Sequence, residues 1–128
     1  MLLKVDDKSR KPMMKRIDAV FAWIILALGV VHICVTPFVY SQFSQSAVWF
    51  AGAGLAGIFA GMLNLIRVRH VNSVPALRTF SLLANLLLLA WIVAGTVSVL
   101  SELHRNPQAL ILLITTLGET LFSANRSP

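Results

Sequence analysis

The chain has 128 residues, of which 57% are hydrophobic and only 12% are charged, with a net charge of +6. Soluble domains carry about 25% charged residues, so this composition excludes an ordinary water-soluble domain. A helix crosses the hydrocarbon core of a bilayer in about 20 residues. We therefore expect an all-α integral membrane protein, a bundle of four transmembrane helices with short loops. The single cysteine, Cys34, allows no internal disulfide.

The first segment, residues 1–16, is predicted to be a mobile cytoplasmic tail. It carries six basic residues: Lys4, Lys8, Arg10, Lys11, Lys15 and Arg16. Each basic residue near anionic headgroups contributes about 1 kcal/mol to membrane attraction, so the expected partner of this tail is the lipid surface. No aromatic residues are interleaved with the charges, and we therefore expect no nucleic-acid binding.

The first helix is predicted over residues 17–40. Asp18 lies at its start, where a helix terminus favours a carboxylate. His32 lies well inside the apolar run, near the same stripe as Asp18, so we expect both side chains to face the bundle. Tyr40 marks the far membrane interface, as aromatic residues commonly do.

The second helix, predicted over residues 47–66, contains no charge and no proline. Ala53, Gly57 and Gly61 recur every four residues and form a seam without side chains. Glycine weakens a helix in water by about 1 kcal/mol per residue, but in a bilayer the backbone must bond to itself. Such a seam lets another helix approach closely, so we expect it to pack against a helix of this chain or of a second copy.

The connection after the second helix, residues 67–78, is basic and contains Pro75, so we place it in the cytoplasm with Arg67 in the loop. The third helix is predicted over residues 79–100. Asn85 lies about two turns from its start, and Ala90 and Ala94 form a second ridge of small residues.

The fourth helix is predicted over residues 107–123, because proline suits the first helical position. Thr115, Glu119 and Ser123 recur every four residues and make a polar stripe along it. Residues 124–128 form a short tail. The domain organisation is therefore a tail, a single membrane domain over residues 17–123, and a second short tail.

The distribution of basic residues predicts the topology. Ten of the eleven lysines and arginines lie in the two tails or in the central connection, and only Arg105 lies in a predicted outer loop. Lysine and arginine near short loops are retained on the cytoplasmic side. Both termini are therefore expected to be cytoplasmic, in a multi-pass protein of a bacterial inner (plasma) membrane.

Four helices place polar residues at comparable depth in the inner leaflet: Asp18, Asn64, Asn85 and Glu119. An ionisable residue inside a membrane is a functional hypothesis by default. The alternative is that Glu119, one turn from the interface, simply reaches water with its side chain. We expect Glu119 to face the bundle, protonated or hydrogen-bonded to Asn85 or Asn64.

The sequence contains no motif of a catalytic or phosphate-binding site and no paired cysteines, so we expect no enzyme, no metal site and no cofactor. A haem between two histidines is not expected either. His32 lies in the outer half of its helix, whereas His70 lies on the other side of the membrane, so no ligand pair shares one depth.

Two functions remain open. The favoured hypothesis is a packing, accessory or assembly module that binds itself or a membrane partner subunit, based on the glycine seam. The alternative is a small oligomeric transporter or channel that uses Glu119 and His32. The candidate polar residues are Glu119, Asn85, Asn64, Asp18, His32 and Thr115, and the candidate packing residues are Ala53, Gly57, Gly61, Ala90 and Ala94.

Overall fold

A computed structural model describes residues 7–98 and 107–125 of the chain. Its helices are α1 (Asp7–Val39), α2 (Gln45–His70), α3 (Ala76–Ser98) and α4 (Pro107–Ala124). Each of the four is long and apolar enough to cross a membrane. The regular structure of the described residues is therefore all helical, and the prediction of four helices that are long and apolar enough to span a membrane is confirmed.

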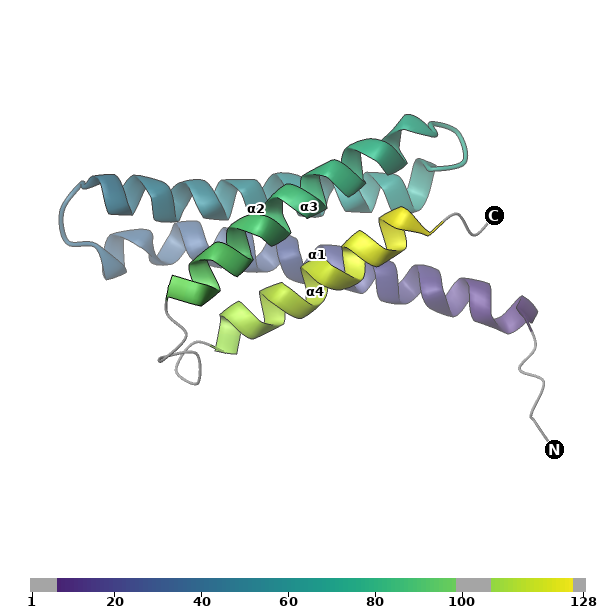
Figure 1. Cartoon of the computed structure of the whole chain (residues 1–128), viewed down its shortest axis with the longest axis horizontal. Coiled ribbons are helices and arrows are strands. Elements are labelled where there is room, and N and C mark those ends of the chain that lie inside the picture. Colours follow the sequence, from purple (N-terminus) through teal and green to yellow (C-terminus); the bar gives the residue numbers. More distant parts are fainter. Residues whose placement is uncertain (1–6, 99–106, 126–128) are drawn as a thin grey trace.

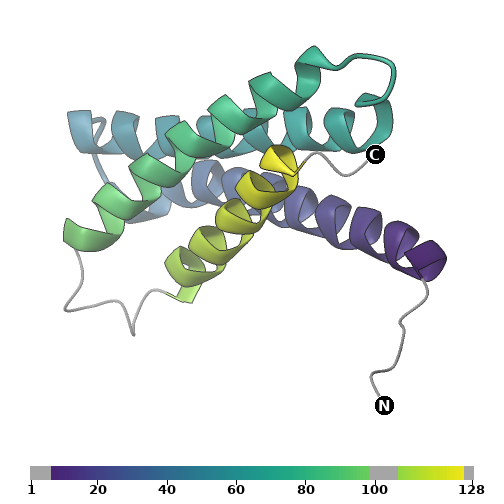
Figure 2. The same ribbon diagram turned by 45° about the vertical axis from the view of Figure 1, so that its right-hand side comes forward.

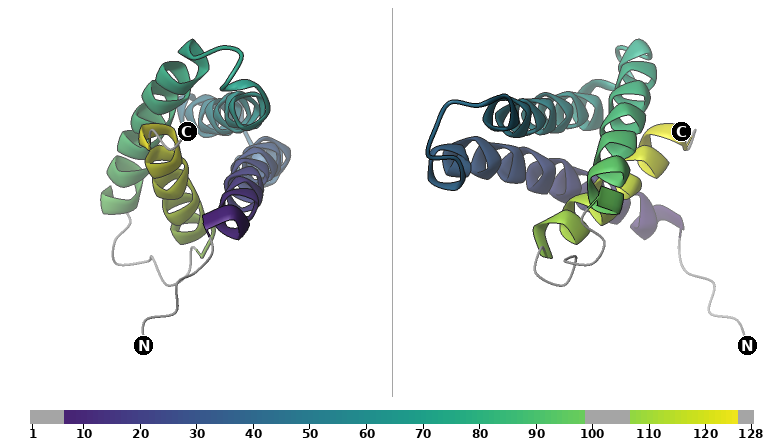
Figure 3. Two further views of the ribbon diagram at one scale, coloured as in Figure 1. Left: turned by 90° about the vertical axis from the view of Figure 1, so that its right-hand side faces the viewer. Right: turned by 60° about the vertical axis from the view of Figure 1, so that its left-hand side comes forward.

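The helices form two antiparallel pairs that cross at an angle. Helices α1 and α2 make a long hairpin, and α3 and α4 lie across it (Figure 1, Figure 2). Viewed from the end, the helices follow one another in a ring, and the main contacts join α1 to α2, α2 to α3, α3 to α4 and α4 to α1 (Figure 3). The start of α1, the end of α4 and the turn between α2 and α3 lie at one end of the bundle. We call this end the proximal end.

Helix α1 begins ten residues earlier than the sequence predicted. Its 33 residues correspond to a length of about 50 Å at about 1.5 Å per residue. The hydrocarbon core is about 30 Å thick. Much of the segment expected to be a mobile tail is therefore a helical extension of the first span, whereas residues 1–6 lie outside the described part of the chain.

Helix α2 is longer than expected at both ends. It begins at Gln45 because Ser44 caps it, with the Ser44 hydroxyl oxygen accepting a hydrogen bond from the backbone N–H of Ala47 at 3.2 Å. It continues to His70 because no glycine or proline interrupts residues 62–70. Arg67, which was expected in a loop, consequently lies within the helix.

The other two helices agree more closely with the sequence. Helix α3 begins at Ala76, directly after Pro75, three residues before the expected start. Its expected end at residue 100 lies outside the described residues. Helix α4 begins at Pro107 as expected and ends at Ala124, one residue beyond the expected end.

The glycine seam of α2 packs against α1 of the same chain. A Cβ atom added to Gly61 would lie 2.8 Å from the backbone nitrogen of Leu26 and 2.9 Å from the backbone oxygen of Ala22. One added to Gly57 would lie 3.4 Å from the Cα of Gly29. Glycine at position 61 therefore allows the two backbones to approach closely, whereas a methyl group at position 57 would make ordinary van der Waals contact.

The close-packed face of α2 differs slightly from the expected seam. Its first member is Gly54, where an added Cβ would lie 2.8 Å from the backbone oxygen of Gly29. Ala53 is only half-buried and lines a groove on the side of α3 instead. Gly54, Gly57 and Gly61 thus form the interface with α1.

The expected ridge on α3 does not pack within the chain, because Ala90 and Ala94 are both exposed. The residues of α3 that face the bundle are Asn85, Leu88 and Ile92, which lie on the opposite side of the helix. At about 3.6 residues per turn, a helix that turns Asn85 inward must turn Ala90 and Ala94 outward.

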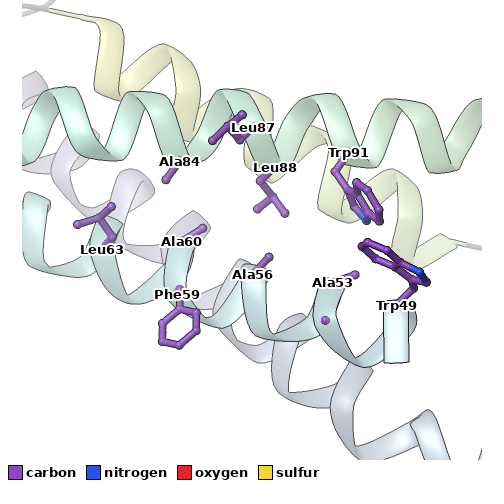
Figure 4. A pocket seen from close by; sticks show the side chains of 11 residues that line it. Trp49, Ala53, Ala56, Phe59, Ala60, Leu63, Ala84, Leu87, Leu88 and Trp91 are labelled. Atoms are coloured by element: carbon purple, nitrogen blue, oxygen red, sulfur yellow. The ribbon is translucent and has the colours of Figure 1, made fainter. Parts of the chain in front are cut away.

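An apolar groove of about 480 Å³ separates α2 from α3. Small residues of α2, among them Gly52 and Ala56, form one wall, and Leu87 and Leu88 of α3 form the other (Figure 4). At one end, the rings of Trp49 and Trp91 stack with their centroids 5.8 Å apart.

The two faces of α2 predict opposite effects of glycine-to-alanine substitution. We expect Gly61→Ala to lower the free energy of unfolding by about 1–3 kcal/mol, because the α1 backbone must move to accept the new methyl group. Gly52→Ala is the matched control, since no atom lies within 4 Å of its added Cβ, and its stability should be unchanged or higher. Thermal unfolding in detergent, followed by circular dichroism, measures both. Equal shifts for the two variants would contradict the interface.

Candidate functional site

The buried polar side chains of the bundle come from all four helices. They are Asp18, Asn64, Arg67, Ser81, Asn85, Thr115, Thr116, Glu119, Thr120 and Ser123. Isolated polar side chains in a bilayer are costly and are therefore satisfied against one another. Six of them are joined by hydrogen bonds toward the proximal end of the bundle, and we call these six the polar cluster: Asp18, Asn64, Arg67, Asn85, Glu119 and Ser123.

Each helix directs its contribution inward because neighbouring positions on the same face are also buried. On α1, Asp18 lies one and two turns before Ala22 and Ile25, both of which have no exposed surface. On α4, Glu119 lies one turn before Ser123, and both are fully buried. Residues spaced three or four apart lie on one face of a helix, so packing of the apolar face also fixes the polar side chains.

Arg67 lies at the centre of the polar cluster. Its Nη2 atom donates to Oδ1 of Asp18 at 2.5 Å and to Oε2 of Glu119 at 2.9 Å. Asp18, Arg67 and Glu119 are 7%, 4% and 0% exposed. A guanidinium from α2 therefore joins carboxyl groups from α1 and α4 in the interior, through the strong class of charge-assisted hydrogen bonds.

Two asparagines connect the remaining helix to this centre. The Nδ2 atom of Asn64 donates to Oδ1 of Asn85 at 2.8 Å, and Nδ2 of Asn85 donates back to Oδ1 of Asn64 at 3.1 Å. Asn85 also donates to the Ser123 hydroxyl at 3.1 Å. Through these bonds, α3 contacts both α2 and α4. The asparagine pair is linked to Arg67 by a long hydrogen bond, in which Nε of Arg67 donates to Oδ1 of Asn64 at 3.5 Å.

Three buried oxygen atoms beside these bonds have no hydrogen-bond partner within the described residues. They are Oε1 of Glu119, the Thr116 hydroxyl and the Ser81 hydroxyl. An ionised carboxylate offers about four acceptor positions. Glu119 fills one of them, with Arg67, so its second oxygen is available for another group.

Four of the candidate polar residues, Asp18, Asn64, Asn85 and Glu119, are brought together. The expected bond from Glu119 to an asparagine is wrong, because the asparagines bond to each other and Glu119 bonds to Arg67. Arg67 takes this place because a cation matches a carboxylate better than a neutral amide does.

The other two candidates lie apart from the cluster. His32 lies 14 residues beyond Asp18 on α1, an axial rise of about 21 Å, and its ring stacks on Phe50 with centroids 3.9 Å apart. Thr115 is buried, but its hydroxyl donates to the carbonyl oxygen of Ile111 in its own helix at 2.8 Å. Neither side chain contributes to the interactions around Arg67.

Arg67 is not among the site residues expected from the sequence. The reason is that lysines and arginines near helix ends are expected in cytoplasmic loops, and Arg67 was placed in such a loop. Two features of the sequence point to it. Arg67 lies three residues after Asn64, on a neighbouring position of the same helical surface, and nothing between them ends a helix. In addition, two inward-facing acids, Asp18 and Glu119, require a cation, and buried charges are normally paired.

Comparison of the chain with protein-family models, curated proteins and solved structures finds no match.

The geometry predicts that Arg67 is essential for the stability of the bundle only while its carboxyl partners can ionise. Arg67→Met should lower the free energy of unfolding by about 3–5 kcal/mol, because it leaves buried carboxylates without a counter-charge. Adding Asp18→Asn and Glu119→Gln to the same chain should restore most of that loss. Unfolding by dodecyl sulfate in mixed micelles measures both quantities.

The matched control is Arg69→Met, since Arg69 is exposed on the same helix and its replacement should change stability by about 0.5 kcal/mol or less. If Arg67→Met behaves like Arg69→Met, or if the triple variant is less stable than Arg67→Met alone, the buried ion network does not hold the bundle together.

Proposed function

We propose that this chain is a small, non-enzymatic transporter or channel that handles a proton or another small cation at its polar cluster. The observation that supports this proposal is the sharing of one guanidinium nitrogen by two buried carboxyl groups, those of Asp18 and Glu119. With both carboxyl groups ionised, the cluster has one positive and two negative charges. It therefore has the capacity to take up one further positive charge.

A change of bound charge gives such a cluster two states. When a cation neutralises one carboxylate, Arg67 is needed only by the other. When the cation leaves, both ionised carboxyl groups share Arg67, whose Nη2 atom lies 2.5 Å from Asp18 and 2.9 Å from Glu119. Because the two acids belong to different helices, the charge state of the cluster biases the packing of α4 against α1. Intramembrane acids commonly serve ion pathways in this way.

A purely stabilising role explains the cluster less well. Replacing a buried ion pair by well-packed apolar side chains is often neutral or even favourable for stability. Leucine-rich helices such as α3 and α4 could pack without these groups. The side chain of Asp18 is 11% exposed, which gives the cluster contact with its surroundings near the proximal end.

The distribution of lysines and arginines supports the proposed membrane setting. In a bacterial inner membrane with both termini in the cytoplasm, the polar cluster lies in the inner leaflet and the basic residues of the N-terminal segment lie among anionic headgroups. We do not assign a role to His32 in this proposal, because it is about 21 Å from Asp18 along α1.

A second function, a packing or assembly module, is supported by a different observation. Ala90 and Ala94 face away from the bundle on α3. Small residues on an exposed face of a membrane helix let a further helix approach closely. In this role the polar cluster would serve as a clamp, and the partner would be a second copy or another membrane subunit.

Ion flux through the purified full-length chain tests the proposed function. We expect proteoliposomes to acidify internally, under an imposed membrane potential, faster than liposomes without protein. Glu119→Gln should lose this flux, since the amide keeps the shape but does not ionise. Thr115→Val is the control: within the described residues its hydroxyl donates to carbonyl oxygens of its own helix, those of Ile111 at 2.8 Å and Leu112 at 3.2 Å, so flux should remain.

Monodisperse wild-type protein that gives no proton or cation flux above empty liposomes would exclude the transporter and leave the assembly module. Flux that persists in Glu119→Gln would exclude the polar cluster as its pathway.

A further inference from the structure

The charge of the polar cluster does not balance with its side chains alone. Facing Glu119 are Asp18 from α1 and Arg67 from α2, whereas α3 presents the neutral Ser81 and Asn85. Arg78, at the first turn of α3, forms no ion pair with the cluster among the described residues. One cation thus faces two acids, and a net negative charge in a largely buried site carries a large desolvation cost.

The two carboxyl groups differ in how well an ionised form is supported. Asp18 makes the shorter bond to Arg67, 2.5 Å against 2.9 Å, and its side chain keeps 11% of its surface exposed. Glu119 is 0% exposed, and its Oε1 atom has no partner in the described part of the chain. An ionised Glu119 would therefore leave a negatively charged oxygen buried and unsatisfied, whereas an ionised Asp18 would not.

A proton fits this position better than a metal cation. A metal cation needs several oxygen ligands around it, and the described residues contain no group of three or more His, Cys, Asp or Glu side chains that could hold one. A proton needs only one oxygen and no space.

We propose that Glu119 binds one exchangeable proton at Oε1, while Arg67 and Asp18 remain an ion pair. On binding, one O–H bond forms at Oε1 and no other covalent bond changes. The net charge of the cluster goes from −1 to 0. The Thr116 hydroxyl lies three residues earlier on α4 and also has no partner within the described ranges. It is on the same face of the helix and can turn toward the new O–H group.

This inference deepens the proposed function, because it names the ion and the atom that binds it, but it does not require that the proton crosses the membrane. The test therefore reads protonation directly. Infrared difference spectra of the full-length protein in lipid nanodiscs should show the carbonyl band of a protonated carboxyl group near neutral pH. That band should disappear as the pH is raised.

Isotope labelling assigns the band without a substitution. Glutamate labelled with carbon-13 at the side-chain carboxyl should shift the band, and labelled aspartate should leave it in place. The chain has two glutamates, Glu102 and Glu119, so the band should persist in Glu102→Gln and be lost in Glu119→Gln. A shift with labelled aspartate, loss of the band in Glu102→Gln, or no band at all would each overturn the proposal.

A third variant tests the charge balance itself. In Asp18→Asn, Arg67 has a single acidic partner, so Glu119 should ionise and the protonated band should be lost although Glu119 is present. Persistence of the band in Asp18→Asn would contradict the one-proton account. If the band behaves as expected but the proteoliposomes show no flux, the proton site stands and the transport function fails. If the proteoliposomes show flux but the band is absent, the transport function stands and the proton site at Glu119 fails.

Discussion

A guanidinium inside an apolar bundle must be matched by acids, and this constraint fixes the rotation of the helices. Arg67 extends from α2 to Asp18 on α1 and Glu119 on α4, and Asn64 links it to Asn85 on α3. A rotation of any one helix would separate a buried charge or amide from its partner. Lipid offers no hydrophobic reward for helix association, so such polar contacts and close packing must specify the bundle.

The glycine interface and the polar cluster depend on each other. Gly54, Gly57 and Gly61 allow α2 to lie close along α1, and the same rigid pair places Arg67 within reach of Asp18. Helix α4 then meets this pair through Glu119. The apolar layer next to the cluster, Ile25, Ala60, Leu88 and Ile92, fills the bundle farther from the proximal end. The fold thus has a small-residue interface in one pair of helices and a charged centre that joins the others to it.

The sequence predicted what composition and spacing control. The number of helices long enough to span a membrane and the start of α4 at Pro107 follow from hydrophobic runs. The inward direction of Asp18, Asn64, Asn85 and Glu119 follows from the cost of polar groups in an apolar environment. The pairing of the glycine seam with α1, rather than with a second chain, could not be predicted. A seam shows that a backbone comes close, but not which one.

Other features depend on three-dimensional contacts that spacing alone does not define. Arg67 was assigned to a loop because the positive-inside rule counts basic residues near helix ends without asking whether they turn inward. Ala90 and Ala94 were expected to pack, but the inward position of Asn85 turns them to the opposite side of α3. Helix α1 begins at Asp7 because the charged segment before residue 17 is also helical. Hydropathy alone places the start of this helix near residue 17.

The bundle and its polar cluster both depend on the position of the Arg67 side chain, and solid-state nuclear magnetic resonance of the protein in lipid bilayers measures that position most directly. With nitrogen-15 in the Arg67 guanidinium and carbon-13 in the side-chain carboxyl groups, dipolar coupling should connect Arg67 to both Asp18 and Glu119. Coupling of the Arg67 guanidinium to lipid phosphorus, with none to either carboxyl carbon, would show that Arg67 lies among the headgroups and would contradict the account.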